Sequence, residues 1–226
     1  MLQLYIGNKN YSSWSLRPWL LMTETGIAFD EIKLRLGWAP DSDFKRRLLA
    51  IAPTGRVPLL VDDGFPVWDS LAIVEYLAEQ HPDKHIWPAA PRDRARARSL
   101  CAEMHSGFVA LRDRFPMNIE ASLPEIGVQA MRESSPVKAD LDCLEEMWRQ
   151  QLAHSGGAFL FGAFSAADAF FAPVCTRIRT YALPVQADTL AYVQRVFDLT
   201  SMQAWCAAAR AEHDFIEEDE PYRTQT

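Results

Sequence analysis

PTGRVPLLVDDGFPVWDSLAIVEYLA, residues 53–78, predicts two short strands and a helix joined by tight turns. Apolar residues from Val57 to Val61 favour a strand, and the segment Phe65 to Trp68 favours the return strand. The turn Asp62-Asp63-Gly64 lies between them, and Asp and Gly tolerate the positive φ that hairpin turns need. Asp69-Ser70 then opens a helix with a broad apolar face. The segment therefore predicts a β-hairpin that runs directly into a helix.

Pro58 indicates a second use for the first of these strands. Proline cannot donate to a sheet ladder, and a cis peptide before proline costs only about 0.5–1 kcal/mol. A cis Val57-Pro58 bond would turn the N–H and C=O groups of Val57 outward, where an extended peptide could pair with them. The free N–H groups at the Asp69-Ser70 helix start attract a carboxylate. Together these features predict a site for a small, extended, acidic peptide; an ordinary hairpin and helix without a ligand is the alternative.

The residues before this stretch predict the rest of a sheet. Met1 to Ile6 alternates apolar and polar residues and favours a first strand, and Ile27 to Leu36 favours a second. A helix between them closes at Gly26, with Pro18 in or near its first turn. Gly37 to Ala52 is less regular. The order strand, helix, strand, hairpin and helix is that of a thioredoxin-like α/β domain.

The loop Asn10-Tyr11-Ser12-Ser13-Trp14-Ser15 follows the first strand and carries the candidate chemistry. Thioredoxin-like redox proteins hold a Cys-x-x-Cys pair here, but Ser12 and Ser15 occupy its outer positions, so a reactive thiol has to come from the ligand. A hydroxyl at a helix N-terminus can donate to a thiolate. Lowering a thiol pKa by about two units requires about 2.7 kcal/mol, which one charge-assisted hydrogen bond and the helix dipole can supply. Helix capping is the plainer interpretation of these serines.

Two motifs resemble cytosolic glutathione transferases. Val57-Pro58, the hairpin and Asp69-Ser70-Leu71-Ala72-Ile73 resemble the thioredoxin-like half of that family, which usually has Glu or Gln where Asp69 stands. Ser12-Ser13-Trp14-Ser15-Leu16-Arg17 is similar to the Ser-Ser-Cys-x-Trp-Arg signature of the zeta class, with Trp14 in place of the cysteine and Leu16 in place of the tryptophan. The resemblance implies that glutathione is the co-substrate and that its thiolate adds to an electrophilic small molecule.

The resemblance also implies roles for individual residues. Ser12 would stabilise the thiolate, and Ser13 is the second candidate for the catalytic hydroxyl. The residues expected to hold glutathione are Trp14, Lys45, Val57, Pro58, Asp69 and Ser70, with Val57 on the cysteinyl backbone, Lys45 on the glycyl carboxylate, and Asp69 and Ser70 on the γ-glutamyl end. The electrophile pocket is expected to include Met104, His105 and Phe108, although a lone histidine on a helix is also a common partner of a backbone group or a carboxylate.

Only helical patterns follow the hairpin segment. We expect a thioredoxin-like glutathione-binding domain over residues 1–82, a linker over 83–91 and an all-helical domain over 92–226. The first long helix of this second half is expected to run to Pro116. Ser165-Ala166-Ala167-Asp168 is a capping-box variant typical of the family's second domain, so Asp168 should be structural. The polar end, from residue 217 onward, is expected to be loose.

Composition excludes several classes of function. A net charge of −7 argues against nucleic acid or an anionic membrane surface as a partner. No apolar run approaches the roughly 20 residues that span a bilayer, and the N-terminus lacks the pattern of a signal peptide. The four cysteines have no metal or redox spacing, so we expect reduced, buried thiols, a cytoplasmic protein and no metal. The family resemblance implies a homodimer.

Two other functions remain open from the sequence. A glutathione-dependent isomerase acting on maleylacetoacetate is one, and a non-catalytic binding protein with the glutathione transferase fold is the other. The physiological electrophile cannot be predicted, because the apolar helix faces that would select it have the same pattern as a hydrophobic core.

Overall fold

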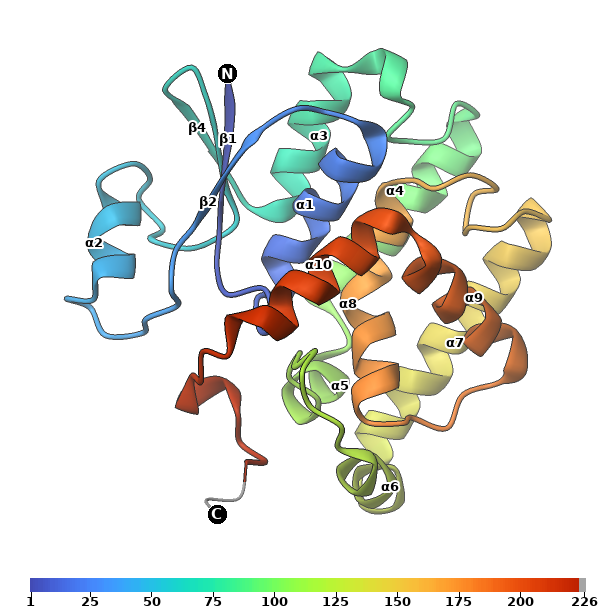
Figure 1. Ribbon diagram of the computed structural model, residues 1–226. Helices are drawn as coiled ribbons and strands as arrows, with labels where there is room; N and C mark the ends of the chain where they lie inside the picture. The colour runs from blue at the N-terminus through green and yellow to red at the C-terminus, as the bar shows by residue number, and fades with distance from the viewer. Residues whose placement is uncertain (224–226) are drawn as a thin grey trace.

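The first half of the chain is built around a four-stranded sheet. The computed structural model describes residues 1–223 (Figure 1). The strands are β1 (Leu2–Ile6), β2 (Asp30–Lys33), β3 (Leu59–Asp62) and β4 (Phe65–Trp68), in the order β2-β1-β3-β4. β1 pairs in parallel with β2 and antiparallel with β3, where Leu4 lies opposite Leu60. This topology confirms the expected thioredoxin-like sheet.

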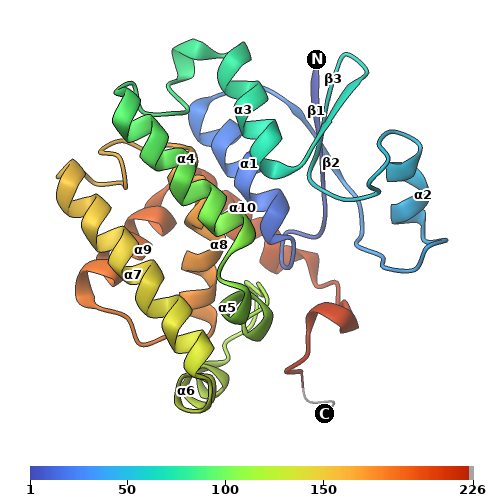
Figure 2. The same ribbon diagram turned by 180° about the vertical axis from the view of Figure 1, so that it is seen from behind.

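Helices cover the two faces of the sheet. α1 (Ser13–Thr25) and α3 (Ser70–Gln80) lie on the face toward the second half of the chain, and α2 (Asp43–Leu49) lies on the other side (Figures 1 and 2). Gly26 has a φ of 68° and its N–H group bonds the carbonyls of the last turn of α1, as the sequence predicts. Asp63 and Gly64 have φ values of 44° and 88°, which is the backbone that the hairpin turn requires.

The second half is helical, and its central helix is buried. The helices are α4 (Pro91–Ser106), α5 (Val109–Arg114), α6 (Pro124–Glu133), α7 (Ser135–Ser155), α8 (Ala166–Thr180), α9 (Ala187–Asp198) and α10 (Thr200–Glu212). α8 packs against α1 and α4, so one continuous hydrophobic core joins the two halves. The start of α8 has the expected capping box between Ser165 and Asp168, and Asp168 also accepts bonds from Leu160 N–H and the Tyr192 hydroxyl.

Three local predictions need correction. The segment expected to be irregular contains α2, because Phe44 and Leu48 are one helical turn apart and both are buried, while Ser42 accepts the N–H of Lys45 as a cap. α1 begins at Ser13, so Pro18 lies in the second turn rather than the first. The strand expected up to Leu36 ends at Lys33.

The first long helix of the second half ends earlier than predicted. α4 stops at Ser106, Gly107 is extended, and Phe108 has a φ of 51°. A Cβ atom at Gly107 would lie only 2.8 Å from the carbonyl oxygen of Glu103, so the close approach at this break needs glycine. The helical spacing of apolar residues continues through the break into α5, which is why the sequence pattern concealed it.

The cysteines and the chain end also differ from expectation. Cys101, Cys175 and Cys206 are buried, but Cys143 is exposed on α7. Residues 217–219 form a short 3-10 helix, and the Tyr222 hydroxyl donates to the carbonyl of Arg114, so the end is anchored as far as it is described. The expectation of a loose end also covers residues 224–226, which lie outside the described residues.

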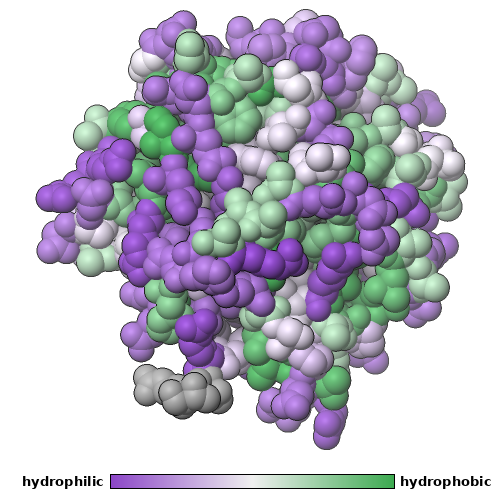
Figure 3. Space-filling view, viewed as in Figure 1, coloured by the Kyte–Doolittle hydropathy of each residue, from purple (hydrophilic) through white to green (hydrophobic). Residues whose placement is uncertain are grey.

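Within residues 1–223, no helix is long and apolar enough to cross a membrane. Hydrophilic residues cover much of the face in Figure 3.

Candidate active site

The loop between β1 and α1 places Ser12 at a cavity wall, and Ser15 in the first turn of α1 lies behind it. Ser12 is the N-cap residue of α1, but its side chain makes no capping hydrogen bond. The Ser12 Oγ instead lies 2.7 Å from the Oγ of Ser15, which accepts the N–H of Gly7 at 3.2 Å. Ser12 is 7% exposed and Ser15 is 0% exposed. Ser12 therefore borders the cavity, and its hydroxyl contacts the buried hydroxyl of Ser15.

Ser13, the second candidate, begins α1 and borders the same cavity. Within residues 1–223, its hydroxyl has no hydrogen-bond partner, so nothing fixes its direction as Ser15 fixes that of Ser12. The sequence did not assign a role to Ser15. Its spacing of three residues from Ser12 at a helix start was the available signal, because such residues lie one above the other on a helix.

The cavity has a volume of about 420 Å³ and lies between the two halves of the chain. Its wall from the first half includes Ser12, Trp14, Lys45 and Val57, and its wall from the second half includes Arg112, Asp113, Met117, Arg177 and Asp219. A smaller cavity of about 270 Å³ shares Trp14, Arg56 and Val57 with it, and therefore adjoins it. The Val57-Pro58 bond, which is cis, lies at this smaller cavity.

The N-terminus of α3 borders the smaller cavity. Asp69 caps this helix, and its Oδ1 accepts the N–H of Leu71 at 2.8 Å. Its Oδ2 lies 3.2 Å from Nε2 of His105, so one residue of the helical half reaches across to this carboxylate. The hydroxyl of Ser70 is buried and has no partner among residues 1–223. An unpartnered hydroxyl beside helix N–H groups suits a carboxylate, and the Asp69 carboxylate suits an ammonium group.

Trp14 borders both cavities, and two guanidinium groups and a histidine ring contact its ring. The guanidinium of Arg17 is 4.2 Å from the ring centroid, that of Arg112 is 5.0 Å away, and the His105 ring packs edge-on at 5.0 Å. Arg17 is only 2% exposed, and burial together with the charges of Arg112 and Arg177 lowers its pKa to about 9.

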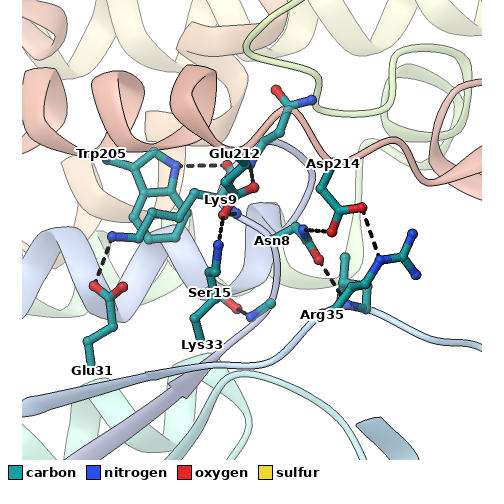
Figure 4. A network of polar contacts seen from close by, with 12 residues as sticks. Asn8, Lys9, Ser15, Glu31, Lys33, Arg35, Trp205, Glu212 and Asp214 are labelled. Atoms are coloured by element: carbon teal, nitrogen blue, oxygen red, sulfur yellow. Dashed lines mark hydrogen bonds and ion pairs between the residues drawn. The ribbon is translucent and has the colours of Figure 1, made fainter. Parts of the chain in front are cut away.

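A network of polar contacts ties the serine loop to the end of α10 (Figure 4). The Asn8 side chain donates to Asp214 at 2.9 Å, and the Lys9 N–H donates to Glu212 at 2.9 Å. Trp205 Nε1–H donates to the carbonyl of Lys9 at 3.0 Å. Residues from opposite ends of the chain thus fix the backbone just before Ser12.

Two family models match the chain in separate regions. The glutathione S-transferase N-terminal domain matches residues 11–80, and the C-terminal domain of the same family matches residues 132–217. A probable maleylacetoacetate isomerase of Caenorhabditis elegans is 30% identical over 153 residues, which are 68% of this chain and 67% of that protein. This chain belongs to the glutathione S-transferase family.

Other members share smaller parts of the chain. The glutathione S-transferase GstB of Escherichia coli is 37% identical over 93 residues, 39% of this chain and 43% of that protein. The maleylacetoacetate isomerase of Rattus norvegicus is 29% identical over 110 residues, 49% of this chain and 50% of that protein. Among solved structures, a Burkholderia glutathione transferase homolog with bound glutathione is 25% identical, with a TM-score of 0.69 over 93% of this chain and 98% of that chain.

Of the other residues predicted for this glutathione S-transferase site, some border one of the two cavities and some border neither. Lys45 borders the larger cavity, and its Nζ donates to the carbonyl of Gly55 at 2.9 Å. Met104 and Phe108, expected in the electrophile pocket, are buried in the hydrophobic core and border neither cavity. His105 borders the smaller cavity, beside Asp69, rather than the larger one. The reason is the break after Ser106, which gives the larger cavity a wall from α5 instead of an extended α4.

Proposed function

We propose that this protein is a glutathione transferase that joins the thiolate sulfur of glutathione to an electrophilic carbon of a small molecule. The observation that carries the proposal is the pair of adjoining cavities. Ser12 borders the larger one, and Asp69 and Ser70, whose hydroxyl has no partner within residues 1–223, border the smaller one. A sulfur-stabilising group and groups for an amino acid end therefore border one connected space.

The proposed roles follow from these positions. The Ser12 hydroxyl donates to the sulfur, and Ser13 is the alternative donor. The Val57 backbone pairs with the cysteinyl residue beside Pro58, and Trp14 contacts the tripeptide where the cavities meet. Asp69 binds the γ-glutamyl ammonium group and Ser70 its carboxylate, while Lys45 binds the glycyl carboxylate. His105 contacts Asp69 and is assigned to the glutathione side of the site.

The proposed role of Ser12 requires only that its hydroxyl stabilise the thiolate of glutathione by one hydrogen bond. A thiol with a pKa of about 8.5 is a few per cent thiolate at neutral pH, and the thiolate is the nucleophile. The thiol proton leaves to solvent, and the sulfur then forms a bond to the electrophilic carbon. In a substitution the leaving group departs with its bonding pair; in an addition the π pair moves to the neighbouring carbon, which takes a proton from water. A charge-assisted hydrogen bond from Ser12, at about 1.5–3 kcal/mol, would raise the thiolate fraction at neutral pH.

Steady-state kinetics with glutathione and chlorodinitrobenzene test this proposal. We expect glutathione-dependent release of chloride, with Ser12→Ala reducing kcat/KM about tenfold or more. Ser99→Ala is the matched control, because Ser99 is an exposed serine on α4 that bonds only its own helix at Ala95. No turnover across a panel of electrophiles, with glutathione binding retained, would instead support the non-catalytic binding protein.

An isomerase is the second candidate, because maleylacetoacetate isomerases, one of them designated probable, are among the relatives. In that reaction glutathione adds to the substrate and is released again, so it is not consumed. Turnover of maleylacetoacetate comparable to that of chlorodinitrobenzene, with glutathione recovered unchanged, would favour the isomerase over the conjugating enzyme.

We also propose a cytoplasmic homodimer with domain limits at residues 1–82 and 92–226 and a linker over 83–91. The proposal of a dimer is supported by edge strand β4, on which Phe65 is 61% exposed and Trp68 is 40% exposed. Large apolar side chains on a sheet edge favour association. Light scattering of the purified protein tests it: twice the chain mass is expected, and a Phe65→Ser variant should dissociate at higher concentration than the parent.

A further inference from the structure

Three arginines gather behind and along the wall of the larger cavity without a carboxylate partner. Arg17 comes from α1, Arg112 from α5 and Arg177 from α8, and the last two border the cavity. Arg177 is only 5% exposed and Arg112 is half-buried. Within the part of the chain that the structure describes, none of the three forms an ion pair. The site therefore contains positive charge that no direct ion pair within residues 1–223 neutralises.

The three guanidiniums are close enough to affect one another. Burial and the charge of Arg112 lower the pKa of Arg177 to about 10, and burial lowers the pKa of Arg112. Nε and Nη1 of Arg17 are buried and have no hydrogen-bond partner among residues 1–223. Gathering buried cations in this way costs free energy unless an anion approaches them.

Backbone carbonyls fix the two cavity arginines without cancelling their charge. Arg177 donates from Nε to the carbonyl of Phe115 at 2.6 Å and from Nη1 to that of Pro173 at 3.1 Å. Arg112 donates from Nη1 to the carbonyls of His105 at 3.2 Å and Gly107 at 3.1 Å. These contacts leave Nη2 of each guanidinium without a bond within residues 1–223. Fixed, positively charged donors at a cavity wall are suited to a carboxylate.

The two cavity arginines come from a different half of the chain than the groups proposed for the carboxylates of glutathione. The groups proposed for the tripeptide's carboxylates, Lys45 and Ser70, belong to the first half of the chain. Arg112 and Arg177 belong to the helical half. Lys45 borders the same larger cavity from its opposite wall, and Ser70 borders only the smaller one. The carboxylates of Asp113 and Asp219 also border the larger cavity, against the cations of Lys45, Arg56, Arg112 and Arg177. The wall is therefore positive on balance.

We propose that the electrophile carries a carboxylate, which Arg112 and Arg177 bind while Arg17 adds positive charge from behind Trp14. This inference rests on the proposed glutathione transferase function and names the substrate class of the same site. Arg112 and Arg177 are specificity-determining residues for that substrate. Neutral electrophiles of the same size would lack the group that the wall recognises.

Calorimetric binding of two product analogues tests the inference without any chemical step. S-carboxyethyl glutathione and S-carbamoylethyl glutathione have nearly the same shape and differ in the charge of the appended group. We expect the wild-type protein to bind the carboxylate analogue about tenfold or more tightly than the amide. Arg112→Gln should reduce this preference to about threefold or less. The matched control is Arg179→Gln, because Arg179 lies on α8 two residues beyond Arg177 and donates to Gln194 at the surface.

Since Arg177 also holds two carbonyls in the core, Arg177→Lys is the second variant, and S-methyl glutathione reports whether each variant retains a folded site. Arg177→Lys should weaken the preference, because lysine lacks the forked donors of arginine. Equal binding of the two analogues by the wild type, with S-methyl glutathione bound, would overturn the inference and leave the proposed function standing. A preference that persists in both variants would overturn the assignment to these arginines. No binding of S-methyl glutathione would contradict the proposed function, and this inference with it.

Discussion

The side-chain oxygens of Ser12 and Ser15 lie 2.7 Å apart, and only the first of them borders the larger cavity. Ser15 Oγ already accepts the N–H of Gly7, so its own hydrogen is available to donate to Ser12. Ser12 can then direct its hydrogen into the cavity. A Cβ atom on Gly7 would lie 3.2 Å from the Cβ of Ser12 and 2.5 Å from Leu36, so this close packing depends on glycine.

Ser15→Ala should therefore reduce activity while leaving glutathione bound. Removal of the hydroxyl frees Ser12 to turn toward its own helix and leaves the Gly7 N–H unpaired. We expect kcat to fall about fivefold, the equivalent of about 1 kcal/mol for a neutral hydrogen bond, with little change in the affinity for glutathione. Calorimetry and steady-state kinetics on the same preparation check this. An unchanged kcat would show that Ser12 needs no support from Ser15.

Asp69 allows its charge to be separated from its role as a helix cap. Asp69→Asn has nearly the same shape and retains a side-chain oxygen that can cap the helix, but removes the negative charge. We expect about tenfold weaker glutathione binding with nearly unchanged stability. Asp69→Ala should weaken binding similarly and also lower the free energy of unfolding by about 1 kcal/mol. Equal glutathione affinity for Asp69→Asn and the wild type would show that the charge of Asp69 does not contribute to glutathione binding.

Asp168 should affect stability and not chemistry. Its buried carboxylate accepts bonds from Leu160 N–H, Ser165 N–H and the hydroxyls of Ser165 and Tyr192. Asp168→Ala leaves these donors unpaired, so we expect the free energy of unfolding to fall by about 3 kcal/mol or more in urea titrations. Ser134→Ala, which removes an ordinary cap from α7, should cost only about 1 kcal/mol. Similar losses in the two variants would contradict the buried network.

Asp219 should make stability depend on pH. Burial, with Glu218 nearby, raises the pKa of Asp219 to about 6 from its ordinary value of 3.8. The folded protein then binds this proton more tightly than the unfolded chain, so the stabilising contribution is present below pH 3.8 and is lost as the pH rises through 6. In Asp219→Asn, residue 219 has no titratable group, so its contribution to stability does not change with pH.

The free energy of unfolding of Asp219→Asn relative to the wild type should therefore rise between about pH 4 and pH 7 and remain constant above that. Urea titrations at several pH values measure this difference. A difference that falls over the same interval would mean that the carboxylate is stabilised in its charged form.

Local chemistry explains which parts of the fold the sequence predicted. The hairpin at Asp63-Gly64, the helix start at Asp69 and the capping box at Asp168 depend on residues within a few positions of one another. Their turn and cap preferences are strong enough to be recognised without tertiary information. The prediction for Ser12 was made in the same way, from its place at a helix start.

Contacts between distant segments explain what the sequence did not reveal. Met104 has the spacing of a helix face, but which wall that face meets depends on how α4 packs against α8. The gathering of Arg17, Arg112 and Arg177 joins three helices that are far apart in the chain, and each arginine alone has the pattern of a surface residue. The contact between His105 and Asp69 likewise joins the two halves.

Titration of the thiol of bound glutathione tests the central claim most directly. The ultraviolet absorbance of the thiolate, measured against pH for glutathione on the wild type, Ser12→Ala and Ser13→Ala, gives the pKa of the bound thiol. We expect a wild-type value below that of free glutathione, a rise of about 1–2 units in Ser12→Ala, and no comparable rise in Ser13→Ala. A bound thiol whose pKa is the same in Ser12→Ala as in the wild type would contradict the assignment of thiolate stabilisation to Ser12.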